Sequence, residues 1–115
     1  MSDNYIEVTH ENFAEKVLRA SGLVIVNFST EQSNVSKIQE PEFEAVSKEY
    51  HDKITFAKLN VTGQDAFTSQ WTVDSVPTML FFKDGAEIYR ITGIVMRARL
   101  RRQLEGILHA NESRS

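Results

Sequence analysis

The chain of 115 residues contains no cysteine, and this absence excludes more chemistry than any other feature of its composition. Without a thiol there is no disulfide, no thiolate nucleophile and no cysteine-based metal site. Two prolines and five glycines exclude collagen-like and low-complexity chains. The longest apolar runs, Leu23–Val26 and Met79–Phe82, fall far short of the roughly 18 residues of a membrane-spanning helix. The N-terminus has neither the basic nor the apolar stretch of a signal peptide, so we expect a cytoplasmic protein without membrane contact.

The amino acids that are present are those of an ordinary globular domain. Apolar residues make up 41% of the chain and charged residues 25%, and the length is close to the commonest domain size. We expect one domain over residues 1–110 and a frayed polar tail over 111–115. The net charge of −3 is unevenly spread, because residues 1–50 hold nine acids and four bases, whereas residues 90–115 hold six arginines and two glutamates. The sequence therefore predicts an acidic body with a basic last helix.

Hydrophobic spacing predicts five strands and four helices. The expected strands are Tyr5–Val8, Leu23–Phe28, Ile54–Leu59, Thr78–Lys83 and Ala86–Thr92. The first expected helix follows an N-cap at Thr9 and ends at Ser21-Gly22, with Phe13, Val17 and Leu18 at helical spacing. The other expected helices are a segment that ends at about Tyr50, Gln64–Trp71 and Met96–Leu108. The order βαβαβαββα predicts an α/β fold with a central mixed five-stranded sheet flanked by four helices.

Three segments refine this expectation. Leu23–Phe28 is apolar except for Asn27, which is typical of a strand that is buried on both faces in the middle of a sheet. Asp84-Gly85 predicts a two-residue hairpin turn between the last two strands. The second helix is expected to pack through a stripe formed by Ile38, Phe43, Val46 and Tyr50.

Over most of its length the sequence resembles the thioredoxin family. The shared features occur in the family's order, without an inserted gap, between about Phe13 and Leu108. They are the strand Leu23–Phe28, Lys37 with Pro41 four residues on, Tyr50, Ala57-Lys58-Leu59-Asn60, Val76-Pro77-Thr78, Phe81-Phe82-Lys83-Asp84-Gly85 and Gly93. The resemblance implies the thioredoxin fold and a cis peptide bond before Pro77.

The sequence departs from the family where the family's redox chemistry takes place. The two active-site cysteines align with Ser33 and Ser36, and the buried aspartate that accepts a proton behind the second cysteine aligns with Asn27. Ser29 and Gln32 stand where the family has tryptophans. The family's apolar helix face after the site is replaced by Gln39, Glu40 and Glu42. A laboratory Cys-to-Ser variant would have kept the rest of the site, so the sequence favours a chain that never performed thiol chemistry.

Ser33 and Ser36 stand three residues apart at the start of a helix. The simplest interpretation is a helix N-cap followed by a hydroxyl in the first turn. A serine nucleophile would need a base within hydrogen-bond reach, and the resemblance places His10, His51 and His109 away from this loop. The three histidines are also too scattered for a metal site. We therefore expect no catalytic residue, no metal and no cofactor.

A candidate peptide-binding groove is implied by the resemblance. In the family the residue before the cis proline offers its backbone to an extended peptide, a strand-like pairing that needs no cysteine. The matching residues here are Gln32, Val61, Val76, Pro77, Thr92, Gly93 and Ile94. The alternative is that Pro77 serves folding alone.

A second candidate surface is a basic cluster near the C-terminus. It consists of Arg90, Arg97, Arg99, Arg101 and Arg102. Such a run is usually a solvated helix face, but arginines near a helix N-terminus oppose the helix dipole, and an acidic partner is the alternative. Nucleic acid is disfavoured as a partner, because the whole chain is acidic and no aromatic residues alternate with the arginines.

The function that the sequence predicts is that of a thioredoxin-like module without redox activity. It would hold a protein or an extended peptide, in the manner of chaperone-type relatives. One alternative is a protein-disulfide oxidoreductase seen as a Cys-to-Ser variant at Ser33 and Ser36. Another is a non-catalytic domain of a larger disulfide isomerase. We expect a monomer or a weak dimer.

Overall fold

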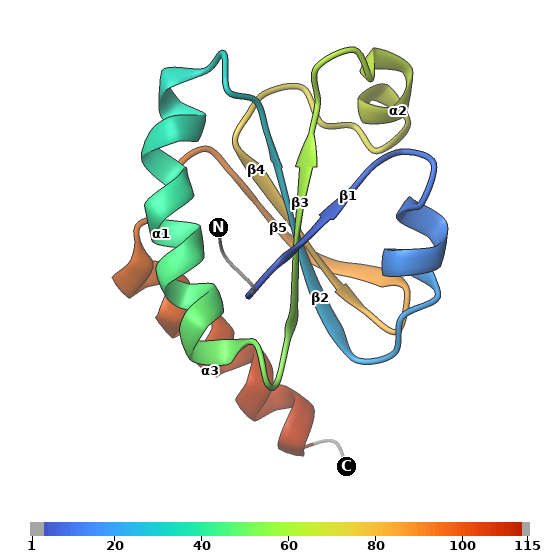
Figure 1. Cartoon of the computed structure of the whole chain (residues 1–115). Coiled ribbons are helices and arrows are strands. Elements are labelled where there is room, and N and C mark those ends of the chain that lie inside the picture. Colours follow the sequence, from blue (N-terminus) through green and yellow to red (C-terminus); the bar gives the residue numbers. More distant parts are fainter. Residues whose placement is uncertain (1–3, 114–115) are drawn as a thin grey trace.

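The computed structural model of the chain describes the backbone of residues 4–113 and the side chains of residues 4–110 (Figure 1). The strands are β1 (Ile6–Val8), β2 (Leu23–Ser29), β3 (Thr55–Asn60), β4 (Thr78–Lys83) and β5 (Ala86–Thr92). The helices are α1 (Asn34–Tyr50), α2 (Asp65–Gln70) and α3 (Arg97–Ser113), together with the π-helical turn η1 (Ala14–Leu18). None of the helices in this described part of the chain is long and apolar enough to cross a lipid bilayer.

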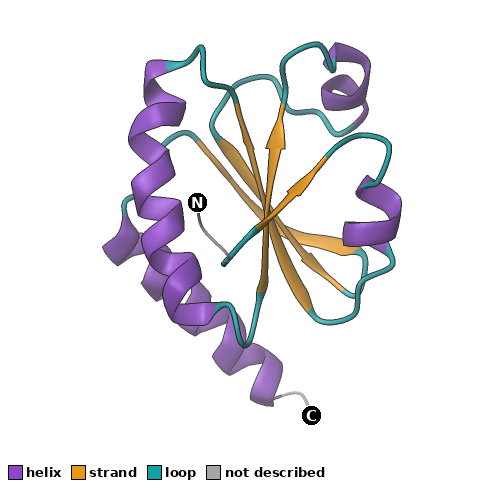
Figure 2. Cartoon of the chain, viewed as in Figure 1, coloured by secondary structure: helices purple, strands orange, loops and turns teal. Residues whose placement is uncertain are grey.

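The five strands form one mixed sheet in the order β1-β3-β2-β4-β5 (Figure 2). The strands β1, β3 and β2 are parallel, whereas β4 runs antiparallel to both β2 and β5. The central strand is β2, and all seven of its residues are buried. These observations confirm the predicted fold class and the position of the doubly buried strand.

Helices cover both faces of the sheet, and the sheet separates the core into two halves (Figure 1). The helices α1 and α3 lie on one face, and η1 and α2 lie on the other. Because successive side chains of a strand point to opposite faces, β2 contributes to both halves. The first half contains Leu23, Ile25, Phe43, Phe56, Phe81, Leu100 and Leu104. The second half contains Phe13, Val17, Val24, Val26, Phe28, Leu59 and Phe82.

The expected core stripe of α1 is wrong at one position. Ile38 is 51% exposed, whereas its neighbour Gln39 is fully buried. A buried amide is tolerated when its polar atoms are hydrogen-bonded, and Gln39 exchanges two hydrogen bonds with the backbone of Val95. The partner lies 56 residues away in sequence, and apolar spacing within the helix therefore does not reveal it.

The first and last helices also differ from expectation. The first is reduced to η1, because a turn precedes it in which the Thr9 backbone N–H donates to Asn12 Oδ1 at 2.7 Å. The last helix begins at Arg97 and continues to Ser113, through residues that contain neither glycine nor proline after Gly106. Part of the expected tail is thus helical, and residues 114–115 lie outside the described residues.

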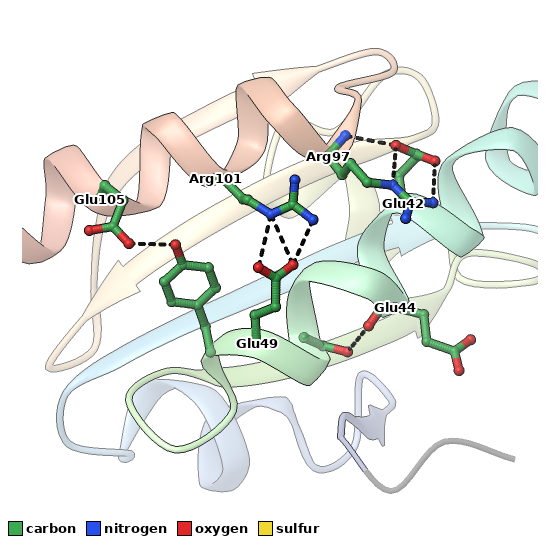
Figure 3. Close-up of polar contacts among 8 residues, drawn as sticks. Glu42, Glu44, Glu49, Arg97, Arg101 and Glu105 are labelled. Atoms are coloured by element: carbon green, nitrogen blue, oxygen red, sulfur yellow. Dashed lines mark hydrogen bonds and ion pairs between the residues drawn. The ribbon is translucent and has the colours of Figure 1, made fainter.

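Ion pairs join α1 to α3 (Figure 3). Glu42 Oε1 accepts a hydrogen bond from the backbone N–H of Arg97 at 2.7 Å, and Glu42 Oε2 accepts one from Arg97 Nη2 at 2.9 Å. Two turns further along α1, Glu49 Oε1 accepts from Arg101 Nε at 2.9 Å. Both contacts combine opposite charge with direct hydrogen bonds, which makes them stronger than neutral ones.

The hairpin between β4 and β5 turns at Asp84-Gly85, where both residues have positive φ, +49° and +86°. This is the geometry of the predicted two-residue turn, and glycine adopts it without steric cost. Gly85 also packs against η1, since a Cβ added there would lie 2.3 Å from the carbonyl oxygen of Leu18. Backbone cannot move aside as a flexible side chain would, so this contact requires glycine.

We predict that Gly85→Ala lowers the free energy of unfolding by about 3 kcal/mol, because it adds a backbone clash to the cost of a left-handed alanine. The matched control is Gly63→Ala. Gly63 has φ +74° but no atom within 4 Å of its added Cβ, so only the conformational cost of about 1 kcal/mol applies. Urea unfolding measures both values. Equal losses in the two variants would contradict the proposed packing against Leu18.

A second prediction concerns the stability of the fold at low pH. Hydrogen bonds from the side chain and backbone of Arg97 lower the pKa of Glu42. Because the folded-state pKa lies below the unfolded value of about 4.3, this carboxylate stabilises the fold above that pH, and the stability is lost as the pH falls through the folded pKa. Glu42→Gln should therefore cost about 1 kcal/mol at pH 7 and progressively less towards pH 3.

Thermal unfolding between pH 7 and pH 3 measures this convergence. Glu15→Gln, at an exposed carboxylate without an ion pair in the described residues, is the control and should follow the wild-type curve at every pH. A Glu42→Gln curve that runs parallel to the wild type down to pH 3 would show that the carboxylate contributes nothing through its charge.

Candidate functional site

The loop that follows β2 carries the two serines at the family's cysteine positions. Ser33 has an extended backbone (φ −105°, ψ 124°), and its Oγ accepts a hydrogen bond from the Ser36 backbone N–H at 3.2 Å. Ser36 is buried, and its Oγ accepts from the Thr30 N–H at 3.4 Å. The predicted N-cap is confirmed. Within the described residues neither serine is hydrogen-bonded to a histidine, so neither has a base to activate it.

Asn27 lies fully buried in β2, beside Lys58 of β3 in the register of the sheet. Neither its Oδ1 nor its Nδ2 has a hydrogen-bond partner among the described residues, and the same is true of Ser29 Oγ. Lys58 pairs instead with Glu40, with Nζ 2.9 Å from Oε2. An unpaired neutral amide costs about 1–3 kcal/mol, far less than an unpaired buried charge. Asn27 is therefore tolerated here, but it offers no carboxylate to accept a proton.

A hollow of about 390 Å³ lies between the end of β2 and the first turns of α1. It is lined by Ser29, Thr30, Glu31, Ser36, Lys37, Glu40, Pro41 and Lys58. Two lysines and two glutamates balance its charge. Among the described side chains, those of residues 4–110, no group of three histidine or acidic residues comes together that could hold a metal ion.

The segment before β4 forms the centre of the candidate groove. The peptide bond between Val76 and Pro77 is cis, Pro77 is buried and Val76 is half-buried. Within the described part of the chain the backbone N–H and C=O of Val76 make no hydrogen bond. Pro77 O accepts from the Gly93 N–H at 2.8 Å, which holds the two segments of the groove together. An unpaired backbone next to a fixed segment can accept an added strand.

The other candidate groove residues surround this segment. Val61 is half-buried, and it lines a hollow of about 210 Å³ together with Val73 and Val76. Thr92 stands opposite Thr78 in the register of β5 and β4 and is exposed. The other two candidate groove residues are Ile94, which is half-buried, and Gln32, which is exposed.

The arginine cluster is largely paired within the chain itself. Three of its five members bind glutamates, as Arg90 does with Glu87, Arg97 with Glu42 and Arg101 with Glu49. Arg99 and Arg102 form no ion pair with any described residue. These internal pairs raise the pKa of Arg90, Arg97 and Arg101 and reduce the net positive charge offered to a partner.

Sequence reasoning missed two residues of α1 that bind the linker between β5 and α3. Gln39 binds the backbone of Val95, and Glu42 binds the backbone of Arg97, in the segment that follows the groove residues 92–94. The spacing of apolar residues could not reveal these contacts. The residue types could have, because Gln39 and Glu42 are polar at positions where the family has an apolar helix face.

Comparison with known proteins identifies the family. A family model described as thioredoxin matches residues 4–106. A thioredoxin of Mycolicibacterium smegmatis is 35% identical over 90% of this chain and 94% of its own length. Those of Buchnera aphidicola and Pseudomonas aeruginosa are 32% and 30% identical, over 87% and 96% of this chain and 93% and 99% of their own lengths. With its sheet order and helix positions, this agreement along nearly the whole sequence shows that the chain belongs to the thioredoxin family.

Proposed function

We propose that this protein is a redox-inactive member of the thioredoxin family that binds proteins through an extended peptide segment. The observation that carries the proposal is the unpaired backbone of Val76 beside the buried Pro77. A peptide laid along this segment would pair with Val76 as an added strand. Val61 and Ile94 would contribute apolar contact on either side. None of these interactions needs a thiol.

The absence of cysteine supports the loss of the family's dithiol exchange, since a serine hydroxyl cannot form or open a disulfide. The buried acid is missing as well, because Asn27 occupies its position in β2. The second candidate function is that of an oxidoreductase whose cysteines at positions 33 and 36 have been replaced by serine. The likeness to thioredoxins along nearly the whole chain supports it, because Ser33 and Ser36 align with the cysteines of that family.

These two functions predict different behaviour when the cysteines are introduced. The wild-type chain should leave the rate of insulin reduction by dithiothreitol equal to the protein-free blank. Ser33→Cys with Ser36→Cys should restore only weak activity, because Asn27 provides no proton acceptor. Adding Asn27→Asp should raise the rate at least about tenfold, in line with the usual contribution of a general base.

Insulin turbidity at pH 7 measures all three proteins. Acceleration by the wild-type chain would overturn the redox-inactive proposal. A double-cysteine variant that already matches the triple variant would favour the oxidoreductase alternative, because it would show that the rest of the site is still tuned for thiol chemistry.

Peptide binding is tested with a peptide selected from a random 12-residue display library against the intact chain. We expect NMR shift changes centred on Val76, Gly93 and Ile94. The dissociation constant should change little between 0.01 M and 0.15 M salt, because strand pairing and apolar burial are weakly screened. Ile94→Asp should weaken binding by at least about tenfold, whereas the control Ile88→Asp, at an exposed isoleucine of β5, should not.

The opposite results are equally clear. Shift changes confined to Arg97–Arg102, with steep weakening at higher salt, would assign binding to the arginine cluster instead. Failure of the library to yield any binder to the folded chain would overturn the proposed function.

A further inference from the structure

The segment from Gly93 to Arg97, which links β5 to α3, is fixed at every second residue. The Gly93 N–H donates to Pro77 O at 2.8 Å, Val95 is bonded through both its N–H and its C=O, and the Arg97 N–H donates to Glu42. Three of the five residues of this linker have backbone hydrogen bonds to other parts of the chain, so its conformation is restricted. Two of these three points of attachment are provided by α1.

Gln39 provides the first of these points. Its Nε2 donates to Val95 O at 2.8 Å, and its Oε1 accepts from the Val95 N–H at 2.7 Å. Both Gln39 and Val95 are buried, at 0% and 1% exposure. Without the amide, two buried backbone groups of Val95 would lose their partners, so the linker would have to move to reach water.

Glu42, three residues further along α1, provides the second point. Its Oε1 accepts from both the N–H and the Nε of Arg97, at 2.7 and 3.2 Å, and its Oε2 accepts from Nη2 (Figure 3). The side chain of Glu42 is only 11% exposed. A carboxylate that binds both the backbone and the side chain of one residue fixes where α3 begins.

Within the linker only Val95 is buried, and it is the residue that Gln39 binds through both of its backbone groups. Val95 is buried, whereas Ile94 is half-buried and Met96 is 52% exposed. The bonds from α1 therefore hold the backbone on the inner side and leave Ile94 and Met96 on the outer side. Ile94 is itself a candidate groove residue, and it directly follows Gly93, whose N–H is bonded to Pro77 O. Met96 comes two residues later on the same linker and is exposed.

From this geometry we infer that Gln39 and Glu42 are positioning residues of the peptide site. They hold residues 93–97 as a rigid wall, with Ile94 and Met96 as its apolar contact surface for a peptide side chain. Met96 is thereby added to the groove. The inference rests on the proposed function, and it explains why polar side chains occupy the buried face of α1 at these positions. Because residues 93–97 are already ordered before the peptide binds, binding does not carry the entropy cost of ordering them.

The chain offers a matched control in the same pair of helices. Glu49 and Arg101 also join α1 to α3, with Nη2 2.7 Å from Oε2, but neither residue bonds to the linker. A variant at Glu49 weakens the contact between the helices without releasing Val95. Comparison with Gln39→Met, which keeps the length of the side chain, therefore separates positioning of the wall from general stability.

The experiment measures amide hydrogen exchange by NMR and the affinity for the library-selected 12-residue peptide. In Gln39→Met we expect the Val95 amide to exchange at least about tenfold faster and the peptide to bind about tenfold more weakly. Glu49→Gln should leave both values unchanged. Met96→Ser should weaken binding without altering exchange at Val95, because it removes contact surface and leaves the bonds intact.

Glu42 keeps the test decisive if Gln39→Met does not fold. Glu42→Gln retains an oxygen that accepts from the Arg97 N–H, so the exchange of that amide and the affinity for the peptide should stay close to the wild-type values, despite the lower stability of this variant at pH 7. Glu42→Ala should release the Arg97 amide and weaken peptide binding. Unchanged affinity in Gln39→Met or Glu42→Ala, with the wild type still binding, would overturn this inference and leave the proposed function standing. A wild-type chain that binds no selected peptide would overturn the proposed function itself.

Discussion

Burial of β2 on both faces is the constraint on which the rest of the molecule depends. All seven residues from Leu23 to Ser29 are buried, so both faces of the sheet must be covered, by α1 and α3 on one side and by η1 and α2 on the other. The same strand ends at the loop that carries Ser33. The position of the candidate site is thus a consequence of how the core is built.

The chain has no cysteine, and its fold does not depend on one. Ser33 uses the hydroxyl that replaces a thiol to cap α1, and Asn27 fills the place of a buried acid with a neutral amide. A neutral group avoids the desolvation cost that a carboxylate would carry at this depth. The ion pair between Lys58 and Glu40 further shows that the neighbouring lysine has a partner other than Asn27.

What remains at this end of the sheet is a backbone surface. Val76 has an unpaired peptide group beside Pro77, and the linker after Gly93 is held by hydrogen bonds from α1. Polar side chains inside the helix interface thus act on a surface that they do not themselves line. The arginines of α3, in contrast, direct much of their charge to glutamates of the same chain, which weakens the case for an acidic partner.

The order of strands and helices, the central position of Leu23–Phe28, the hairpin at Asp84-Gly85 and the absence of a thiol could all be predicted from the sequence. These follow from local spacing and from the chemistry of single residues, and both can be read from a one-dimensional chain. Only the tertiary structure decided that Gln39 is buried and Ile38 exposed, and that Arg97 and Arg101 are paired. These outcomes depend on partners more than 50 residues away, such as Val95 for Gln39, and the spacing of residues within one helix carries no information about such partners.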